Sequence, residues 1–211
     1  MNDILFYSVQ LYIDSLNQLS YVEDEDVLNH MEDYAEKSGF PIVNRSVGRF
    51  LYLITKLKNP KLIVEIGSGY GYSAYWFAKA IDSGKVVLTD YKPENLEKAK
   101  EYLGKSGLLE KVEFRVGNGV EIAKEYKDVD IFFFDHEKSK YLDTVLQLKT
   151  NLKSGGLIIA DNTLWHGKVL QENPDNQTKK IKEFNEYMFS SKEFFTTLIP
   201  LRDGVLIALK L

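Results

Sequence analysis

The stretch that decides the fold is Val64-Glu65-Ile66-Gly67-Ser68-Gly69-Tyr70-Gly71, an apolar run that leads directly into a glycine-rich turn. The three glycines have no Cβ, so the backbone can turn sharply and approach a ligand closely. In an open α/β sheet, such a turn places a nucleoside-bearing ligand at the carboxyl edge of the strands. The dinucleotide fingerprint requires a further glycine at position 72, where this chain has Tyr72. The turn therefore predicts a nucleoside site without the nicotinamide spacing.

Downstream of this turn, strand-like and helix-like segments alternate. Strands are predicted over residues 61–66, 86–90, 112–116, 131–134 and 157–160, with helices over 72–81, from Pro93, after Asn118 and through 141–148. This alternation predicts a parallel sheet covered on both faces. Two further strand-like runs, 194–199 and 205–209, are joined through Asp203-Gly204, a pair that favours a tight hairpin turn. We therefore expect an α/β fold with a mostly parallel, seven-stranded sheet that ends in an antiparallel hairpin.

Upstream of the turn, apolar residues recur at helical spacing, which predicts three amphipathic helices before the first strand. The acidic run 23–26 suits the start of the second helix, where carboxylates complement the helix dipole, better than it suits a metal site. We expect one domain, residues 1–211, with a helical extension over 1–58 and the α/β core over 59–211. The polar segment 171–177 is predicted to be a mobile loop.

The composition excludes several classes of protein. A net charge of −4 gives no global basic field for nucleic acid or anionic membranes. Because there are no cysteines, disulfides, thiolate metal sites and cysteine nucleophiles are excluded. The amino terminus lacks a cationic stretch followed by an apolar run, and no apolar stretch is long enough to span a bilayer. We expect a cytoplasmic protein.

Polar side chains stand at the ends of three predicted strands. Asp135 follows the strand 131–134, and Asp161-Asn162 follows the strand 157–160. Two carboxylates and an amide oxygen at neighbouring strand ends suit a hard divalent cation, although each aspartate alone also suits a helix cap. Asp90 ends the strand 86–90, where a carboxylate can accept hydrogen bonds from both ribose hydroxyls; the alternative is a role in starting the next helix. Buried Glu65 needs a partner, such as a cationic ligand end.

Several motifs occur together in this chain: Val64-Glu65-Ile66-Gly67, Gly71-Tyr72-Ser73, Asp90, Phe134-Asp135-His136-Glu137-Lys138 with Tyr141, Asp161-Asn162-Thr163-Leu164-Trp165-His166-Gly167, and Asp203-Gly204. Their combination resembles the cation-dependent O-methyltransferases, a family that includes caffeoyl-coenzyme A and catechol O-methyltransferases. The resemblance covers about Pro41 to the end of the chain. It implies a Rossmann-like class I methyltransferase fold, with S-adenosylmethionine and Mg²⁺ or another divalent cation as cofactors.

The resemblance also implies roles for individual residues. The metal ligands would be Asp135, Asp161 and Asn162, and the catalytic residues Asp135 and Lys138, the lysine accepting the hydroxyl proton or assisting its loss. The acceptor pocket would be lined by Tyr141, Trp165 and His166, although a tryptophan at such a position is often part of the core. The cofactor-binding residues would be Ile42, Val43, Glu65, Gly67, Ser73, Asp90, Gly117, Asn118, Gly119, Asp135, His136 and Glu137.

The expected reaction is methyl transfer to a hydroxyl of a small phenolic or catechol-like acceptor. A strict catechol specialist is not expected, because no acidic residue near Pro200 replaces the substrate-holding glutamate of the animal catechol enzymes. The alternative is a tRNA 5-hydroxyuridine methyltransferase, since residues 33–42 resemble bacterial members with that activity; the lysines that would then meet phosphates are Lys168, Lys179, Lys180 and Lys182. A cofactor-binding protein without catalysis is less favoured, because the metal and lysine positions are intact.

The first helix carries apolar residues that the sheet does not need to bury, namely Leu5, Val9 and Tyr12. Such a face marks an interaction surface. We therefore expect a homodimer, with a cover over the acceptor pocket as the other role for these helices.

Overall fold

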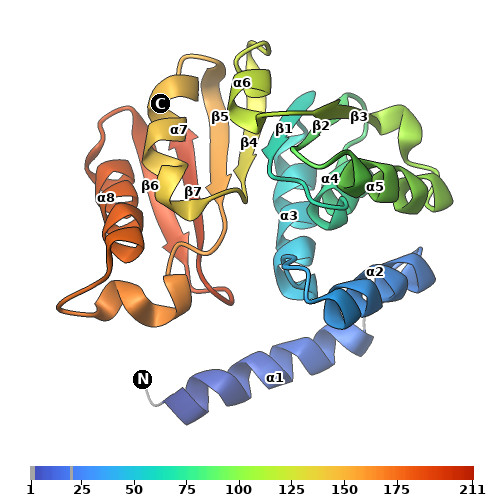
Figure 1. Cartoon of the computed structure of the whole chain (residues 1–211), viewed down its shortest axis with the longest axis horizontal. Coiled ribbons are helices and arrows are strands. Elements are labelled where there is room, and N and C mark those ends of the chain that lie inside the picture. The colour runs from blue at the N-terminus through green and yellow to red at the C-terminus, as the bar shows by residue number, and fades with distance from the viewer. Residues whose placement is uncertain (1–2, 20) are drawn as a thin grey trace.

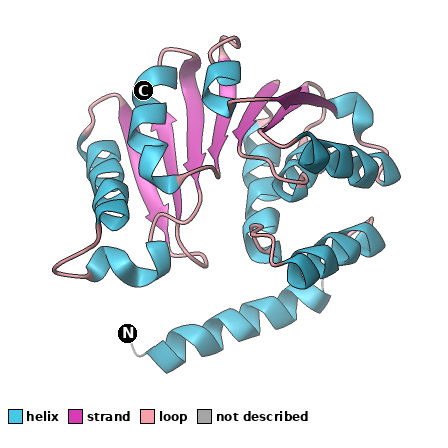
Figure 2. Ribbon diagram, in the orientation of Figure 1, coloured by secondary structure: helices cyan, strands magenta, loops and turns pink. Residues whose placement is uncertain are grey.

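The computed structural model describes residues 3–19 and 21–211, with side chains from residue 8 onward except that of residue 18. Seven strands form one sheet with helices on both faces (Figures 1 and 2). The strands are β1 Leu62–Ile66, β2 Lys85–Asp90, β3 Val112–Val116, β4 Val129–Phe134, β5 Leu152–Ala160, β6 Phe194–Ile199 and β7 Val205–Lys210. The helices are α1 Asp3–Leu19, α2 Glu25–Ser38, α3 Arg45–Lys58, α4 Tyr72–Ala80, α5 Pro93–Lys105, α6 Gly119–Ala123, α7 Tyr141–Leu148 and α8 Asn176–Ser190, with short 3₁₀ turns η1 Leu109–Lys111, η2 Lys138–Lys140 and η3 Trp165–Leu170.

The strand order is β3-β2-β1-β4-β5-β7-β6; the pairs from β3 to β5 are parallel, and β7 is the strand that runs antiparallel to both of its neighbours, β5 and β6. The predicted fold class is therefore confirmed. The chain runs outward from β1 to β2 and β3 and then returns to β4 on the other side of β1. This reversal of strand order between β1 and β4 creates the crevice where open α/β sheets bind ligands. In register, Ile66 lies beside Phe134, and Phe134 lies beside Ala160. The residues that follow these three strands consequently meet at one edge.

Alternation along the strands divides the core into two layers. In β4, Ile131 and Phe133 pack toward α3, α4 and α5, whereas Phe132 and Phe134 pack toward α6, α7 and α8. Successive side chains of a strand point to opposite faces, so an unbroken apolar run is required when helices cover both. These phenylalanines are completely buried. The uninterrupted run 131–134 is explained by this double burial.

The helix α8 was not predicted from the sequence. Its start is capped by Asp175, whose carboxylate accepts the Thr178 N–H at 2.7 Å. Its buried face carries Ile181, Phe184 and Met188 at helical spacing. These signals are present in the sequence, but the polar stretch before them was interpreted as a loop. The predicted loop 171–177 is consequently shorter, because residues 176 and 177 belong to α8.

The C-terminal hairpin is present, but its connection differs from the tight turn predicted from Asp203-Gly204. Ile199 pairs with Val205, which leaves five residues, 200–204, in the loop. The carbonyl groups of the Asp-Gly pair bind another segment: Gly204 accepts the Thr163 N–H at 3.0 Å and Asp203 accepts the Leu164 N–H at 2.8 Å. The Gly204 N–H donates to the Leu201 carbonyl oxygen at 3.0 Å, so a turn is present within this longer loop.

The three N-terminal helices precede β1 as predicted, and α1 packs against α3 (Figure 1). Two of the apolar residues expected on its outer face are exposed, Val9 by 43% and Tyr12 by 65%. The side chain of Leu5 lies outside the described residues. Among the described helices, none combines the length and the apolar character that crossing a bilayer would require.

Candidate functional site

A cavity of about 750 Å³ opens at the carboxyl edge of the sheet, over the ends of β1, β4 and β5. Its walls come from the segment before α3, the glycine turn, the loop after β2 and the starts of α6 and α7. Most of the predicted site residues line it: Ile42, Val43, Gly67, Ser73, Asp90, Gly117, Asn118, Gly119, Asp135, His136, Glu137, Lys138, Asp161 and Asn162. Glu65, Tyr141, Trp165 and His166 are not among the lining residues.

All three glycines of the glycine turn adopt positive φ and leave no room for a Cβ, and two of them line the cavity. Gly67 has φ +88°, and a Cβ there would lie 2.9 Å from the Asp135 carbonyl oxygen. Gly69 has φ +51°, and a Cβ there would lie 2.8 Å from the Phe40 ring. Both the backbone conformation and the close neighbours exclude a side chain. The turn is thus packed between the loop after β4 and the segment before α3, and its backbone faces the cavity.

Glu65 lies below the cavity floor and is completely buried. One of its carboxylate oxygens accepts a hydrogen bond from the Ser73 hydroxyl, and the other has no partner. Burial raises the pKa of Glu65 to about 7, although the nearby hydroxyl groups of Ser73 and Ser68 act in the opposite direction. Ser73 itself lines the cavity. Glu65 is therefore connected to the cavity through Ser73 and retains one free acceptor.

Asp90 is held firmly at the end of β2. Its Oδ2 accepts the Gly69 N–H at 3.1 Å, and its Oδ1 accepts the Lys92 N–H at 2.8 Å and the Asn95 side-chain amide at 3.0 Å. The carboxylate thus ties the glycine turn to the start of α5 while it lines the cavity. Asn118 combines two roles in a similar way, because its Oδ1 caps α6 by accepting the Val120 N–H at 3.0 Å.

Two carboxylates face the cavity from neighbouring strand ends. Burial raises the pKa of both Asp135 and Asp161, and the charge of Asp135 raises that of Asp161 further. Two largely buried carboxylates at adjacent strand ends favour a shared cation, since the charge would relieve their repulsion. Over residues 3–19 and 21–211, no three His, Cys, Asp or Glu side chains form a metal-binding group. The third donor of a cation site here would be the amide oxygen of Asn162.

The side chain of Asn162 is oriented by Asp203, a residue of the β6–β7 loop. Asn162 adopts φ +58°, and its Nδ2 donates to Asp203 Oδ2 at 3.3 Å. Asp203 also accepts the His166 N–H through Oδ1, so both of its carboxylate oxygens are hydrogen-bonded. The Asp203 side chain is 15% exposed. With its Nδ2 engaged, Asn162 can present Oδ1 to the cavity. From the sequence, Asp203-Gly204 is recognised as a motif and predicts a turn, but it does not predict that the Asp203 side chain binds Asn162.

Lys138 begins the short turn η2, three residues after Asp135. Its ammonium group lies 2.7 Å from Asp135 Oδ1, and both side chains are less than one-fifth exposed. The ammonium charge lowers the pKa of Asp135 against the effect of burial. Lys138 thus lines the cavity and is paired with a candidate metal ligand. It is not a solvent-exposed lysine at the start of a helix.

Tyr141 and His136 form the floor between the cavity and the core. The hydroxyl of Tyr141 donates to the Phe134 carbonyl oxygen at 2.8 Å, and the ring is completely buried. Tyr141 therefore supports the strand ends and does not line a pocket, which differs from its expected role. His136 Nε2 lies 2.9 Å from Thr144 Oγ1, whereas Nδ1 is buried without a partner. Burial lowers the pKa of His136 to about 3, so its imidazole is neutral.

Trp165 and His166 also lie outside the cavity lining. Both adopt left-handed backbone conformations, with φ +48° and +53°, because the β6–β7 loop holds the backbone of this segment. His166 is exposed, and Trp165 packs against it with ring centroids 5.5 Å apart. The structure thus places these two residues beside the candidate metal ligands, outside the lining itself.

Some cavity residues were not identified from the sequence. Phe40, Tyr72 and Thr89 contribute to the walls, as do Thr144 and Gln147 of α7. Thr144 and Gln147 are three residues apart and therefore share a helix face. The signal for the α7 pair was available in that spacing, but which face meets the cavity depends on packing. The lysines considered for tRNA contact lie elsewhere, and none of Lys168, Lys179, Lys180 and Lys182 lines the cavity.

Comparison with known proteins shows similarity to O-methyltransferases over nearly the whole chain. Residues 18–211 match the model of a protein family described as O-methyltransferase. The chain is 30% identical to a catechol O-methyltransferase of Niastella koreensis, with 99% of both proteins covered. It is 31% identical to caffeoyl-CoA O-methyltransferase 2 of Petunia hybrida, over 95% of this chain and 90% of that protein.

A solved structure with the same fold is that of a methyltransferase from Geobacter sulfurreducens, at 34% sequence identity. The TM-score is 0.84, and the match covers 97% of this chain and 96% of the other. The sheet order and the helices before it therefore agree with a methyltransferase over nearly the complete length.

Proposed function

Because the chain belongs to the O-methyltransferase family and is therefore an S-adenosylmethionine-dependent methyltransferase, we propose that it methylates a hydroxyl of a small phenolic acceptor beside a bound divalent cation. The observation that carries this proposal is the convergence of Asp135, Asp161, Asn162 and Lys138 on the cavity that the glycine turn borders. The names of relatives that act on catechol and caffeoyl-CoA support the acceptor class.

In this proposal the cofactor lies along the edge from β2 to β4. Asp90 accepts hydrogen bonds from the ribose hydroxyls, since its backbone and side-chain partners already hold its carboxylate in place. Gly67 allows close approach of the ligand to the backbone. His136, with a neutral imidazole, and Glu137 lie toward the adenine. The unpaired Nδ1 of His136 is available there as a hydrogen-bonding group. The Ser73 hydroxyl, which is bound to Glu65, faces the amino-acid part of the cofactor.

The residues at the ends of β4 and β5 fit a divalent cation, because two carboxylates and an amide oxygen form a hard donor set. Asp135, Asp161 and Asn162 would hold the ion. When bound, the cation lowers the pKa of a coordinated hydroxyl and orients it. Asp203 keeps the Asn162 amide turned toward the site, and Tyr141 supports the backbone carbonyl groups of Phe134 and Asp161.

The reaction forms one oxygen–carbon bond, breaks one sulfur–carbon bond and releases the hydroxyl proton. We assign Lys138 the role of assisting loss of this proton electrostatically as an ammonium group, or of accepting the proton when its amine is neutral. Its contact with Asp135 keeps the side chain in the cavity. Lys138 thus lies beside one of the candidate cation ligands.

The metal dependence is tested by chelation. Methyl transfer to a vicinal diphenol should fall to background in excess EDTA and return when Mg²⁺ is added in excess over the chelator. Asp135→Ala and Asp161→Ala should each reduce kcat by at least about a hundredfold, because metal-site and oxyanion-stabilising groups have effects of this size. Asp82→Asn, at an exposed acid paired with Lys56, is the matched control. Undiminished turnover in EDTA would contradict the proposal.

The acceptor class is tested by a screen that monitors release of S-adenosylhomocysteine. Phenolic acceptors with adjacent hydroxyls should support turnover, whereas hypomodified tRNA should not. The reverse result would replace the phenolic acceptor with the tRNA alternative while leaving the cofactor site unchanged.

A further inference from the structure

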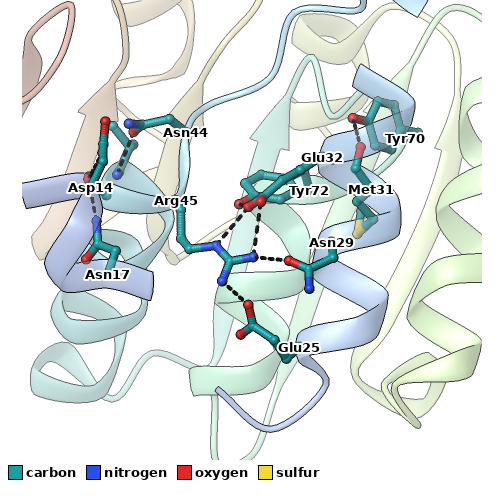
Figure 3. Close-up of polar contacts among 12 residues, drawn as sticks. Asp14, Asn17, Glu25, Asn29, Met31, Glu32, Asn44, Arg45, Tyr70 and Tyr72 are labelled. Atoms are coloured by element: carbon teal, nitrogen blue, oxygen red, sulfur yellow. Dashed lines mark hydrogen bonds and ion pairs between the residues drawn. The ribbon is translucent and has the colours of Figure 1, made fainter. Parts of the chain in front are cut away.

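Two tyrosines at the glycine turn, Tyr70 within it and Tyr72 at the start of α4, bind α2 through their hydroxyl groups (Figure 3). The Tyr70 hydroxyl donates to the Met31 carbonyl oxygen at 2.8 Å, and the Tyr72 hydroxyl donates to the Glu32 carboxylate. Both tyrosine side chains are almost completely buried. Because Met31 and Glu32 are consecutive, the turn that borders the cofactor cavity holds α2 at one position along its length.

Arg45, the first residue of α3, completes this arrangement (Figure 3). Its guanidinium group binds both oxygens of Glu32, with Nε and Nη2 each 3.0 Å away. It also donates to Glu25 and to Asn29 Oδ1, the latter at 2.9 Å. Glu25, Asn29 and Glu32 are spaced four and three residues apart and therefore share one face of α2. A planar five-donor group is suited to such a set, whereas a lysine is not.

The contacts of Arg45 matter for the cavity because of what precedes it in the chain. Phe40, Pro41, Ile42 and Val43 line the cavity, and Asn44 caps α3 by accepting the Val47 N–H at 3.0 Å. At the other end of this segment, the Phe40 ring packs on Gly69 and edge-on against Tyr70, with centroids 5.0 Å apart. Segment 40–43 is therefore fixed at both ends by residues that also touch α2 or the glycine turn.

Apolar packing also holds α2 in place. Leu28 and Met31 are completely buried in the core and give the helix an apolar anchor. Partly exposed ion pairs contribute little to stability, so a multiple contact on one arginine serves orientation more than folding. Tyr72 lines the cavity, and its hydroxyl is bound to Glu32. Glu32 is thus in direct contact with a residue of the cavity wall.

We propose that Arg45 and Glu32 are positioning residues for the cofactor site: with Tyr72 they form a clamp that holds segment 40–43 as a preformed wall of the cavity. Through this clamp, α2 sets the affinity for the nucleoside-bearing cofactor and the rate at which its product leaves. A wall that is already ordered removes an entropic cost from binding. The inference rests on the proposed function only in placing S-adenosylmethionine in this cavity.

The clamp is tested with Arg45→Lys, which retains the charge and loses the planar donor group, and with Tyr72→Phe, which removes one hydroxyl and leaves the Arg45–Glu32 pair. Arg45→Lys should raise the Kd for S-adenosylhomocysteine about tenfold by calorimetry, the change expected when a bidentate charge-assisted contact is lost. The KM for S-adenosylmethionine should rise in parallel, while kcat at saturating cofactor stays within about twofold. Tyr72→Phe should raise the Kd in the same direction.

A second measurement reports on the segment itself. In the ligand-free Arg45→Lys protein, amide hydrogen exchange over residues 40–44 should be faster than in the wild type, and saturating S-adenosylhomocysteine should restore the wild-type rate. The matched control is Arg115→Lys. Arg115 likewise contacts a tyrosine hydroxyl, that of Tyr126 at 3.0 Å, and two glutamates, but it does not line the cavity. Its substitution should leave the Kd unchanged.

Wild-type affinity and wild-type exchange over residues 40–44 in Arg45→Lys would overturn the clamp. An equal loss of affinity in Arg45→Lys and Arg115→Lys would also overturn it, because the effect would then be general destabilisation. Neither result depends on the metal or the acceptor. Failure of the proposed function would instead appear as methylation that persists in excess EDTA, with the exchange result unaffected.

Discussion

At the scale of single residues, Glu65 makes the stability of the protein depend on pH. Its pKa in the folded chain is about 7, against an ordinary value of 4.5. When an acid has a higher pKa in the folded than in the unfolded state, the free energy of unfolding falls as pH rises through the interval between the two pKa values. For Glu65 this interval runs from about 4.5 to about 7, and the total loss is about 3 kcal/mol. Glu65→Gln keeps an acceptor for Ser73 and has no charge to bury.

The Glu65→Gln protein, measured without cofactor, should therefore lose less stability between pH 5 and pH 8 than the wild type. Urea unfolding at several pH values gives the two free energies of unfolding for comparison. Identical pH dependence in both proteins would show that Glu65 is not the buried acid responsible.

A second prediction at this scale concerns Asp203, which holds the Asn162 side chain without facing the cavity itself. Residues that orient a metal ligand typically change metal affinity by ten- to a hundredfold when they are replaced. Asp203→Ala should therefore weaken Mn²⁺ binding about tenfold, as measured by electron paramagnetic resonance of the free ion. The neighbouring variant Arg202→Ala, whose side chain points to Asp14, should bind Mn²⁺ as the wild type does. Equal binding by all three proteins would remove Asp203 from this role.

At the scale of elements, Asp130 connects the beginnings of β1 and β4. Its Oδ2 accepts the Lys61 and Leu62 N–H groups at 2.8 and 3.0 Å, and its Oδ1 pairs with Lys153. Asp130→Ala leaves two backbone donors without a partner, which should cost roughly 2 kcal/mol of unfolding free energy. Lys153→Ala removes only a partly exposed partner and should cost less than about 1 kcal/mol. Chemical denaturation tests both, and a larger effect of the Lys153 variant would contradict this assignment.

At the scale of the whole molecule, the outer face of α1 supports the expectation of a homodimer. Val9, Tyr12 and Leu16 are exposed by 43%, 65% and 44%, and lie three and four residues apart on one helix face. Large contiguous apolar patches mark interaction sites. Light scattering at micromolar concentration should give twice the mass of the chain, and Tyr12→Glu should shift the mass toward that of a monomer. A wild-type monomer at this concentration would exclude the dimer.

Sequence alone determined the sheet, the glycine turn and the strand-end acids, because periodicity and the ends of strands are local properties that a parallel sheet brings to one edge. The position of Tyr141 was not predicted correctly: it was expected to line the acceptor pocket, but its ring is buried in the core. Only the tertiary structure decided which groups, 13 to 41 residues apart in the chain, bind one another: Asp203 with Asn162, and Arg45 and Tyr72 with Glu32. Such pairs depend on how elements pack, and a one-dimensional pattern carries no record of that packing.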